Sequence, residues 1–332
     1  MELKAKFLRI VLWIVGIVVG LTAVALIAFN FYMGSSKPII EGELTVSVLD
    51  ENVTVIRDEM GVPHIEAQSD ADLYRAQGYV QAQDRLFQMD LARRQASGRL
   101  AEIIGEGAVE NDKFFRTFSL RDAAEKSWDG YDAQSKQVLE WFTEGVNAYI
   151  EEGRLSYEFN LLGYEPELWT PIDSLTIGKF MAYDLGGNWN LLAFRHWALN
   201  NLSEQQVAEM IVDYPEEARS IIEANLENEV QVADAFHIDA IPNEFNGSNN
   251  WVVAADKSET GAPLLADDPH LGLDTPSIWY QMHLKSPEQN VSGVIFAGIP
   301  GIILGHNEQV AWGVTNANPQ VQDLYIEKPN PD

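Results

Sequence analysis

An apolar run near the N-terminus constrains this chain more than any other feature of its sequence. The residues from Ile10 to Phe29 are apolar, interrupted only by two glycines and a threonine. A helix of that length rises about 1.5 Å per residue and spans roughly 30 Å, the thickness of the hydrocarbon core of a bilayer. We therefore predict a transmembrane anchor over residues 10–33.

Positive charge flanks this run unevenly. Lys4, Lys6 and Arg9 precede it, and only Lys37 follows it closely. Because basic residues favour the cytoplasmic side, residues 1–9 are predicted to be cytoplasmic, with the bulk of the chain outside. The expected location is the cell membrane, as a single-pass protein.

A cleavable signal peptide is the competing interpretation of the same run. Its apolar region usually has about 7 to 15 residues and ends in a small-x-small cleavage site. The present run is longer, and residues 33–36, Met-Gly-Ser-Ser, match such a site poorly. These two observations favour the uncleaved anchor.

Composition excludes several classes of function. The formal net charge is -28, with 22 Lys and Arg against 50 Asp and Glu, so no basic face is available to bind nucleic acid. The same acidic excess can attract divalent cations. The chain has no cysteine, which excludes disulfides, thiolate zinc sites and a thiol nucleophile.

The exported part changes character along the chain, and we predict an α+β fold. Residues 44–202 are expected to be mainly helical, residues 203–247 an acidic spacer, and residues 248–332 a region of strands. Between Glu204 and Glu244 there are eleven acidic residues and one basic residue. The predicted helices are 69–105, opened by a Ser69 and Asp72 capping box, 133–150, and a helical region 175–202 interrupted at Gly186-Gly187. The predicted strands are 44–57, 251–255, 263–266, 291–297, 302–304 and 310–315.

The junction at Gly247-Ser248 is the candidate chemical site. A Gly-Ser-Asn-Asn run is most often a turn, and the residues alone leave that interpretation open. If the peptide bond between Gly247 and Ser248 were broken, Ser248 would carry a hydroxyl and an α-amine. Such an amine has a pKa of about 7.7 to 8.0, so it can act as the base that activates the hydroxyl. Gly247, which lacks a Cβ, permits backbone strain at the bond to be cleaved. The strand after the junction is expected to be buried.

Five blocks of this sequence together resemble the penicillin acylase family of N-terminal nucleophile hydrolases, and they span roughly residues 46 to 332. The blocks are Val55–Asp58 with Gly61–Ile65, Gln81–Met89, Asn246–Trp251, Leu265–Leu271, and Gly305–Glu308 with Ala311–Asn316. The resemblance implies a precursor that excises a spacer between a helical α-subunit and a β-subunit beginning with serine. It also implies an αββα fold of stacked antiparallel sheets. The implied activity is hydrolysis of N-acyl amides such as penicillins and acyl-homoserine lactones.

Site roles follow from the resemblance residue by residue. Ser248 matches the nucleophile and base, and Gly247 matches the residue before the cleavage point. The backbone N-H of Asn316 matches one oxyanion donor, and His270 matches the residue that binds the nucleophile's amine. Taken alone, Asp267, Asp268 and His270 form no recognised metal site, because three donors within four residues do not match one.

Calcium is the implied ion, and the match for it is incomplete. Asp323 matches one calcium ligand of the family. Gln320 stands where a second aspartate is expected, and the segment Asn188–Leu192 offers no clear counterpart of the family's glutamate. Calcium prefers six to eight oxygen ligands from several segments.

The sequence ends at Asp332, before the region in which the family places the rest of the β-subunit. We therefore expect an incomplete αββα fold, whose partner is the remaining β-subunit portion of a precursor. The alternative is a truncated, non-catalytic binding module tethered to the membrane. A serine hydrolase with a His and Asp triad is disfavoured, because the chain contains no G-x-S-x-G motif.

Overall fold

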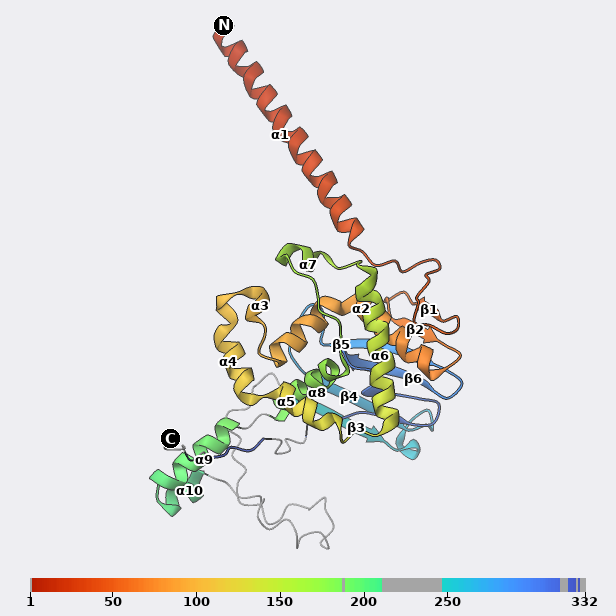
Figure 1. Ribbon diagram of the computed structural model, residues 1–332, viewed down its shortest axis with the longest axis vertical. Helices are drawn as coiled ribbons and strands as arrows, with labels where there is room; N and C mark the ends of the chain where they lie inside the picture. The colour runs from red at the N-terminus through yellow and green to blue at the C-terminus, as the bar shows by residue number, and fades with distance from the viewer. Residues whose placement is uncertain (1, 187–188, 211–246, 317–321, 327, 329–332) are drawn as a thin grey trace. The chain divides into compact units, whose positions relative to one another are not determined.

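The computed structural model describes all residues except 1, 187–188, 211–246, 317–321, 327 and 329–332. Most of the predicted acidic spacer, residue Gln320 and residue Asn188 therefore lie outside the described residues. The chain forms two compact units, residues 1–179 with 276–311, and residues 180–275 with 312–332. Each unit takes residues from both sides of Gly247. Helices and strands occur together in the fold, which confirms the α+β prediction (Figure 1).

The first unit holds most of the helices and the larger sheet. Its elements are α1 (Glu2–Ser35), β1 (Thr54–Arg57), β2 (Pro63–Glu66), α2 (Asp70–Ala96), α3 (Ala101–Ile104), η1 (Glu106–Ala108), α4 (Val109–Phe118), α5 (Leu120–Trp128), α6 (Ala133–Glu152), α7 (Tyr157–Leu162), β5 (Trp279–Lys285), β6 (Asn290–Phe296) and β7 (Leu304–His306). The helix α8 (Pro171–Gly186) and the strand β8 (Ala311–Trp312) cross the boundary between the units. The second unit holds α9 (Trp189–Asn201), α10 (Glu204–Met210), β3 (Gly247–Val253), η3 (Ala255–Lys257) and β4 (Leu264–His270).

The helix α1 carries the apolar run. It contains a stretch, Arg9–Asn30, that is long and apolar enough to cross a membrane by length and composition. A signal sequence near an N-terminus meets the same criteria. The large apolar side chains of this stretch are exposed.

The larger sheet joins segments that are far apart in the sequence. Its strand order is β1-β2-β5-β6-β7-β8. The strands β2 and β5 are parallel, with His64 opposite His283, whereas β5 and β6 are antiparallel. The apolar residues of α2 pack on this sheet and form a hydrophobic core with it. The centre of this core consists of Ile65, Leu73, Met282, Leu284 and Ile295. A strand that precedes Gly247 is thus paired with one that follows it.

The helices α2 and α6 lie side by side, and two glycines allow their backbones to touch (Figure 1). A Cβ added at Gly78 would lie 2.1 Å from the backbone oxygen of Phe142, and one added at Gly145 would lie 1.8 Å from that of Arg75. A second core fills the space around this crossing, with Phe142, Val146, Tyr149, Phe159 and Trp169 among its members. No larger residue fits at either glycine unless the two helices separate.

The start of α2 confirms half of the predicted capping box. The hydroxyl of Ser69 accepts a hydrogen bond from the Asp72 backbone N-H at 3.2 Å. The Asp72 carboxylate does not accept the reciprocal hydrogen bond from the backbone N-H of Ser69 that a complete capping box contains. It accepts instead from the backbone N-H groups of Asp50 and Glu51, both at 3.0 Å. The cap thus also fixes the segment before β1.

The predicted helix 69–105 is interrupted. The helix α2 ends at Ala96, and Gly98 adopts a left-handed φ of 63°. The chain then turns into α3, whose first N-H groups, those of Leu100 and Ala101, donate to the Asp112 carboxylate at 2.9 and 2.7 Å. A long-range contact with α4 decides this break, and local periodicity does not report such a contact.

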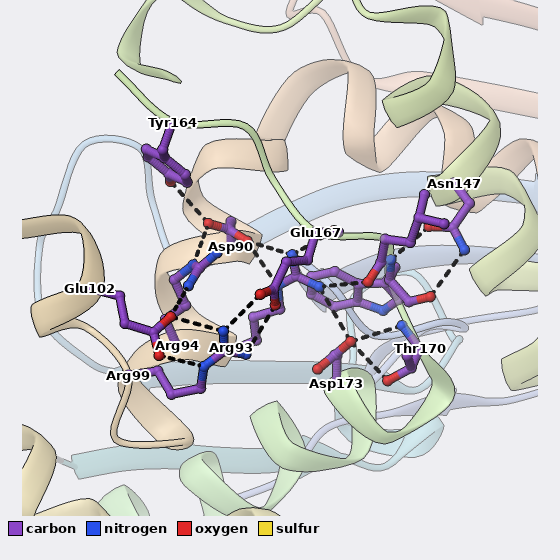
Figure 2. A network of polar contacts seen from close by, with 12 residues as sticks. Asp90, Arg93, Arg94, Arg99, Glu102, Asn147, Tyr164, Glu167, Thr170 and Asp173 are labelled. Atoms are coloured by element: carbon purple, nitrogen blue, oxygen red, sulfur yellow. Dashed lines mark hydrogen bonds and ion pairs between the residues drawn. The ribbon is translucent and has the colours of Figure 1, made fainter. Parts of the chain in front are cut away.

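Buried charges connect the end of α2 to two other segments (Figure 2). Asp90 is completely buried, and its carboxylate accepts from Arg93, Arg94 and the hydroxyl of Tyr164. Arg93 also donates to the Glu167 backbone carbonyl at 2.7 Å and forms an ion pair with Asp173 at 3.3 Å. Because every charge in this cluster faces an opposite charge, the cost of removing these groups from water is offset.

Two buried glutamines on α2 hold the loop between β6 and β7. Gln81 accepts from the backbone N-H of Gly298 at 2.9 Å and donates to the carbonyl of Ile299 at 3.1 Å. One turn earlier, Gln77 makes the same pair of bonds with the N-H and carbonyl of Gly301, both at 2.9 Å. Each side-chain amide therefore provides hydrogen-bond partners for backbone N-H and carbonyl groups in a loop that forms no strand.

Other sequence-based boundaries also changed. Only residues 54–57 of the predicted strand 44–57 form a strand, and β2 and β5 were not predicted. In contrast, the predicted interruption of the helical region 175–202 at Gly186-Gly187 is confirmed, because α8 ends at Gly186 and α9 begins at Trp189. The strand after the junction was predicted to be buried, and this was wrong, because Trp251 is 56% exposed. Among the described residues β3 pairs only with β4.

Candidate active site

The candidate site lies on the hairpin of β3 and β4 in the second unit. The two strands are antiparallel, and Gly247 pairs with His270, Ser248 with Pro269 and Asn250 with Asp267. The run Gly-Ser-Asn-Asn is therefore the start of a strand, so the turn interpretation was wrong. The turn lies farther along the chain, and its Gly261 has a φ of 69°.

Alternation along the strands divides the site residues between two faces. Ser248 and Asn250 share one face with their partners Pro269 and Asp267, and all of them are partly buried. The opposite face carries His270, which is exposed. The covered face is therefore the one on which the serine hydroxyl lies.

A backbone N-H group meets the serine hydroxyl on that face. The N-H of Asn316, four residues after β8, donates to Oγ of Ser248 at 3.0 Å. The side-chain amide of Asn316 donates to the backbone carbonyl of Leu185 in α8. The structure thus brings together two of the residues that the sequence selected, Ser248 and Asn316.

The side chain of His270 is not directed at the serine hydroxyl. Its Nδ1 lies 2.6 Å from the backbone carbonyl oxygen of Asp268, and its Nε2 lies 3.4 Å from the amide nitrogen of Asn249. Because a carbonyl oxygen only accepts, Nδ1 carries the proton, and in the neutral ring Nε2 is the acceptor. The role assigned to His270, binding the amine of a freed Ser248, stays a prediction.

Gly247 lies in regular extended backbone. Its φ is not positive, and a Cβ added at Gly247 would contact only the Cβ of His270, at 3.8 Å. The structure therefore gives no sign of the backbone strain that the sequence analysis expected at this position. Because it has no side chain, Gly247 leaves open space beside the peptide bond.

Asp267 is the site residue that sequence reasoning did not select. Both of its carboxylate oxygens are buried, and neither has a hydrogen-bond partner among the described residues. Gly313 packs against it, since a Cβ added at Gly313 would lie 2.6 Å from the Cβ of Asp267 and 2.6 Å from the amide nitrogen of Asn250. The adjacent acidic residue Asp268 is exposed, so sequence alone could not separate the two.

The described residues contain no group of three or more histidine or acidic side chains that could hold a metal ion. Asp323, the predicted calcium ligand, is exposed, and Gln320 lies outside the described residues. This set does not match the six to eight oxygen ligands that calcium prefers. Calcium binding stays a prediction.

The fold and the site define an α+β protein in which a strand-borne serine hydroxyl is held by a backbone N-H group, an arrangement suited to a nucleophile. The family model for penicillin amidase matches residues 52–332. The chain belongs to the penicillin amidase family.

Relatives within this family are similar over most of the chain. Penicillin acylase 2 proenzyme of Pseudomonas sp. strain SE83 is 36% identical over 309 residues, covering 89% of this chain and 40% of the relative. The acyl-homoserine lactone acylase QuiP of Pseudomonas aeruginosa is 34% identical, covering 88% and 36%. The chain thus spans about two fifths of the length of these relatives. A solved structure of a thermostable penicillin G acylase from Alcaligenes faecalis is 29% identical, with a TM-score of 0.43, covering 52% of this chain and 97% of that one.

Proposed function

We propose that the gene product is an amide hydrolase that cleaves itself between Gly247 and Ser248 and then uses Ser248 as its nucleophile. The observation that carries this proposal is the hydrogen bond from the Asn316 N-H to Oγ of Ser248 at 3.0 Å. When Oγ attacks a carbonyl carbon, the carbonyl oxygen becomes an oxyanion next to Oγ. A donor already fixed at Oγ is therefore in place to stabilise that charge.

The reaction has two stages. In the first, Oγ attacks the Gly247 carbonyl, the peptide bond breaks, and water hydrolyses the resulting ester. In the second, the freed α-amine of Ser248 takes the proton of Oγ as the hydroxyl attacks the acyl carbon of the substrate. The amine component of the substrate leaves with a proton, and water releases the acyl group.

The substrate class comes from the relatives. One is named a penicillin acylase and another an acyl-homoserine lactone acylase, and both kinds of compound contain an N-acyl amide. We propose an N-acyl amide of this kind as the substrate. The name proenzyme in the first relative supports a precursor that is processed.

The organisation of the gene product follows from the same proposal. Residues 44–202 belong to a helical α-subunit, residues 203–247 to an excised spacer, and residues 248–332 to the start of a β-subunit with an αββα fold. The helix α1 anchors the protein, with residues 10–33 in the membrane and the bulk outside. Extraction of membranes with alkaline carbonate tests this placement, because a peripheral or secreted protein is released and an anchored one is not.

N-terminal sequencing of the processed protein tests the mechanism. We expect a chain that begins Ser-Asn-Asn-Trp. We expect Ser248→Ala to remain unprocessed, and Ser248→Cys to be processed, because a thiol can make the same attack. Ser258→Ala, in the exposed turn of the same hairpin, is the control and should be processed normally. Normal processing of Ser248→Ala would refute the proposal.

A further inference from the structure

The self-cleavage step lacks a base if Ser248 acts alone. In the mature enzyme the α-amine of Ser248 can accept the hydroxyl proton, but before cleavage that nitrogen belongs to a peptide bond. A peptide nitrogen is not basic, so another group must accept the proton when Oγ attacks the Gly247 carbonyl. That group must lie on the same face of the hairpin as the hydroxyl.

The hydroxyl of Ser248 has one partner already. Its oxygen accepts from the Asn316 N-H, and the described residues provide no acceptor within hydrogen-bond distance for its own proton. The N-H bond stabilises negative charge on Oγ, which favours loss of the proton. The missing component is therefore an acceptor and not a further donor.

The carboxylate of Asp267 fits this requirement. Ser248 pairs with Pro269, and Asp267 lies two residues before Pro269 on the same strand. Asp267 is thus the diagonal neighbour of Ser248 on one face, a relationship in which α-carbons are about 7 to 8 Å apart. The two side chains form no hydrogen bond with each other in this structure, so the carboxylate would reach the serine hydroxyl through one water molecule or after a change of rotamer.

Asp267 is also the one acidic side chain among the described residues whose two oxygens are both buried without a partner. A buried carboxylate normally accepts several hydrogen bonds, and leaving it unpaired is costly. Packing of Gly313 against Asp267 and Asn250 holds it there. An unpaired carboxylate beside a hydroxyl with an undonated proton indicates that the two groups act together.

We propose that Asp267 is the proton acceptor for self-cleavage, which rests on the proposed function. The carboxylate takes the Oγ proton as the bond from Oγ to the Gly247 carbonyl carbon forms. The tetrahedral intermediate collapses, the bond from that carbon to the Ser248 nitrogen breaks, and Asp267 returns the proton to the departing nitrogen. An ester, a free amine and the original carboxylate remain, and water then hydrolyses the ester.

The test compares processing rates of the complete gene product in four forms. Asp267→Asn keeps the shape of the side chain but cannot accept the proton, so we expect processing to slow by at least about 10²-fold. Asp267→Glu should recover part of the rate. Asp267→Ala should be accelerated by added formate, a small carboxylate that can occupy the space left by the side chain. Asp268→Asn is the matched control, since that side chain is 78% exposed on the other face, and it should be processed normally.

The outcomes separate the two proposals. Processing of Asp267→Asn at the wild-type rate overturns the role of Asp267 and leaves the proposed function intact. Slow processing of Asp267→Ala that formate does not accelerate, together with a lowered melting temperature, shows a purely structural role and also overturns it. A wild-type protein that is never cleaved before Ser248 refutes the proposed function itself. Formate rescue at an unchanged melting temperature supports the proposal.

Discussion

The backbone nitrogen of Asn316 donates to the hydroxyl of Ser248 across 68 residues of sequence, with a distance of 3.0 Å. The same residue uses its side chain to bind the carbonyl of Leu185. One asparagine therefore links the end of α8 to the first residues of β3 within the second unit. The main-chain donor and the side-chain anchor can be separated by mutation.

Replacing Asn316 by proline removes the N-H donor. Because that donor is proposed to stabilise the oxyanion, hydrolysis of an N-acyl amide should fall by about 10²- to 10³-fold. Asn316→Ala keeps the N-H and loses the side-chain bond to Leu185, so its rate should fall less. Rates from a chromogenic phenylacetyl amide, measured on the processed proteins, give the comparison. Equal losses in both variants would show that the side chain is the important group.

Gly145→Ala should destabilise the first unit. The new Cβ would lie 1.8 Å from the Arg75 backbone oxygen, and such overpacking costs about 1 to 3 kcal/mol. Gly178→Ala in α8 is the control, because no atom beyond its chain neighbours and the adjacent backbone of its own helix lies within 4 Å of its added Cβ. That change should stabilise by about 0.5 to 1 kcal/mol, since alanine favours helix. Urea unfolding followed by circular dichroism measures both, and an unaffected Gly145→Ala would contradict the close crossing of α2 and α6.

Asp90→Asn should cost about 3 to 5 kcal/mol in the free energy of unfolding, because it removes the buried counter-charge that Arg93 and Arg94 share and leaves their charges only partly compensated. The loss is expected at this position because Asp90 accepts from both Arg93 and Arg94. Glu110→Gln breaks the ion pair with Lys113, whose side chains are 85% and 67% exposed. That control should change stability by less than about 1 kcal/mol. Similar small effects for the two variants would show that the buried network is dispensable.

Glu167 should make stability depend on pH in acid. The hydrogen bond from Arg99 lowers the pKa of Glu167 to about 2, against the opposing effect of burial. A lowered pKa in the folded state contributes stability above the unfolded pKa of about 4.3, and this contribution is lost as pH falls toward 2. Glu167→Gln should therefore be less stable than the wild type at pH 6 and equally stable near pH 2. Urea unfolding across this range, with exposed Glu165→Gln as control, detects the difference. A constant difference at every pH would exclude Glu167 as its source.

Much of the fold was predictable where local pattern is strong. The apolar run, the helix 133–150 and the strand near 291–297 were found from periodicity, and α1, α6 and β6 match them closely. The break after Ala96 and the strand β5 were not found. The first depends on contacts with Asp112 and the second on pairing with both β2 and β6, and neither interaction leaves a period in the sequence.

The sequence by itself determined the chemical identity of the candidate site, because residue type decides which groups can attack, donate or accept. Ser248 was selected in this way, whereas Asn316 was selected through the resemblance to the penicillin acylase family, and the tertiary structure places the two in contact. Only the tertiary structure decided which neighbours share their face. Strand register sends Asp267 to the side of Ser248 and His270 to the other side. A shift of one residue in pairing reverses that assignment, and pairing is set by contacts between distant segments that a linear pattern does not contain.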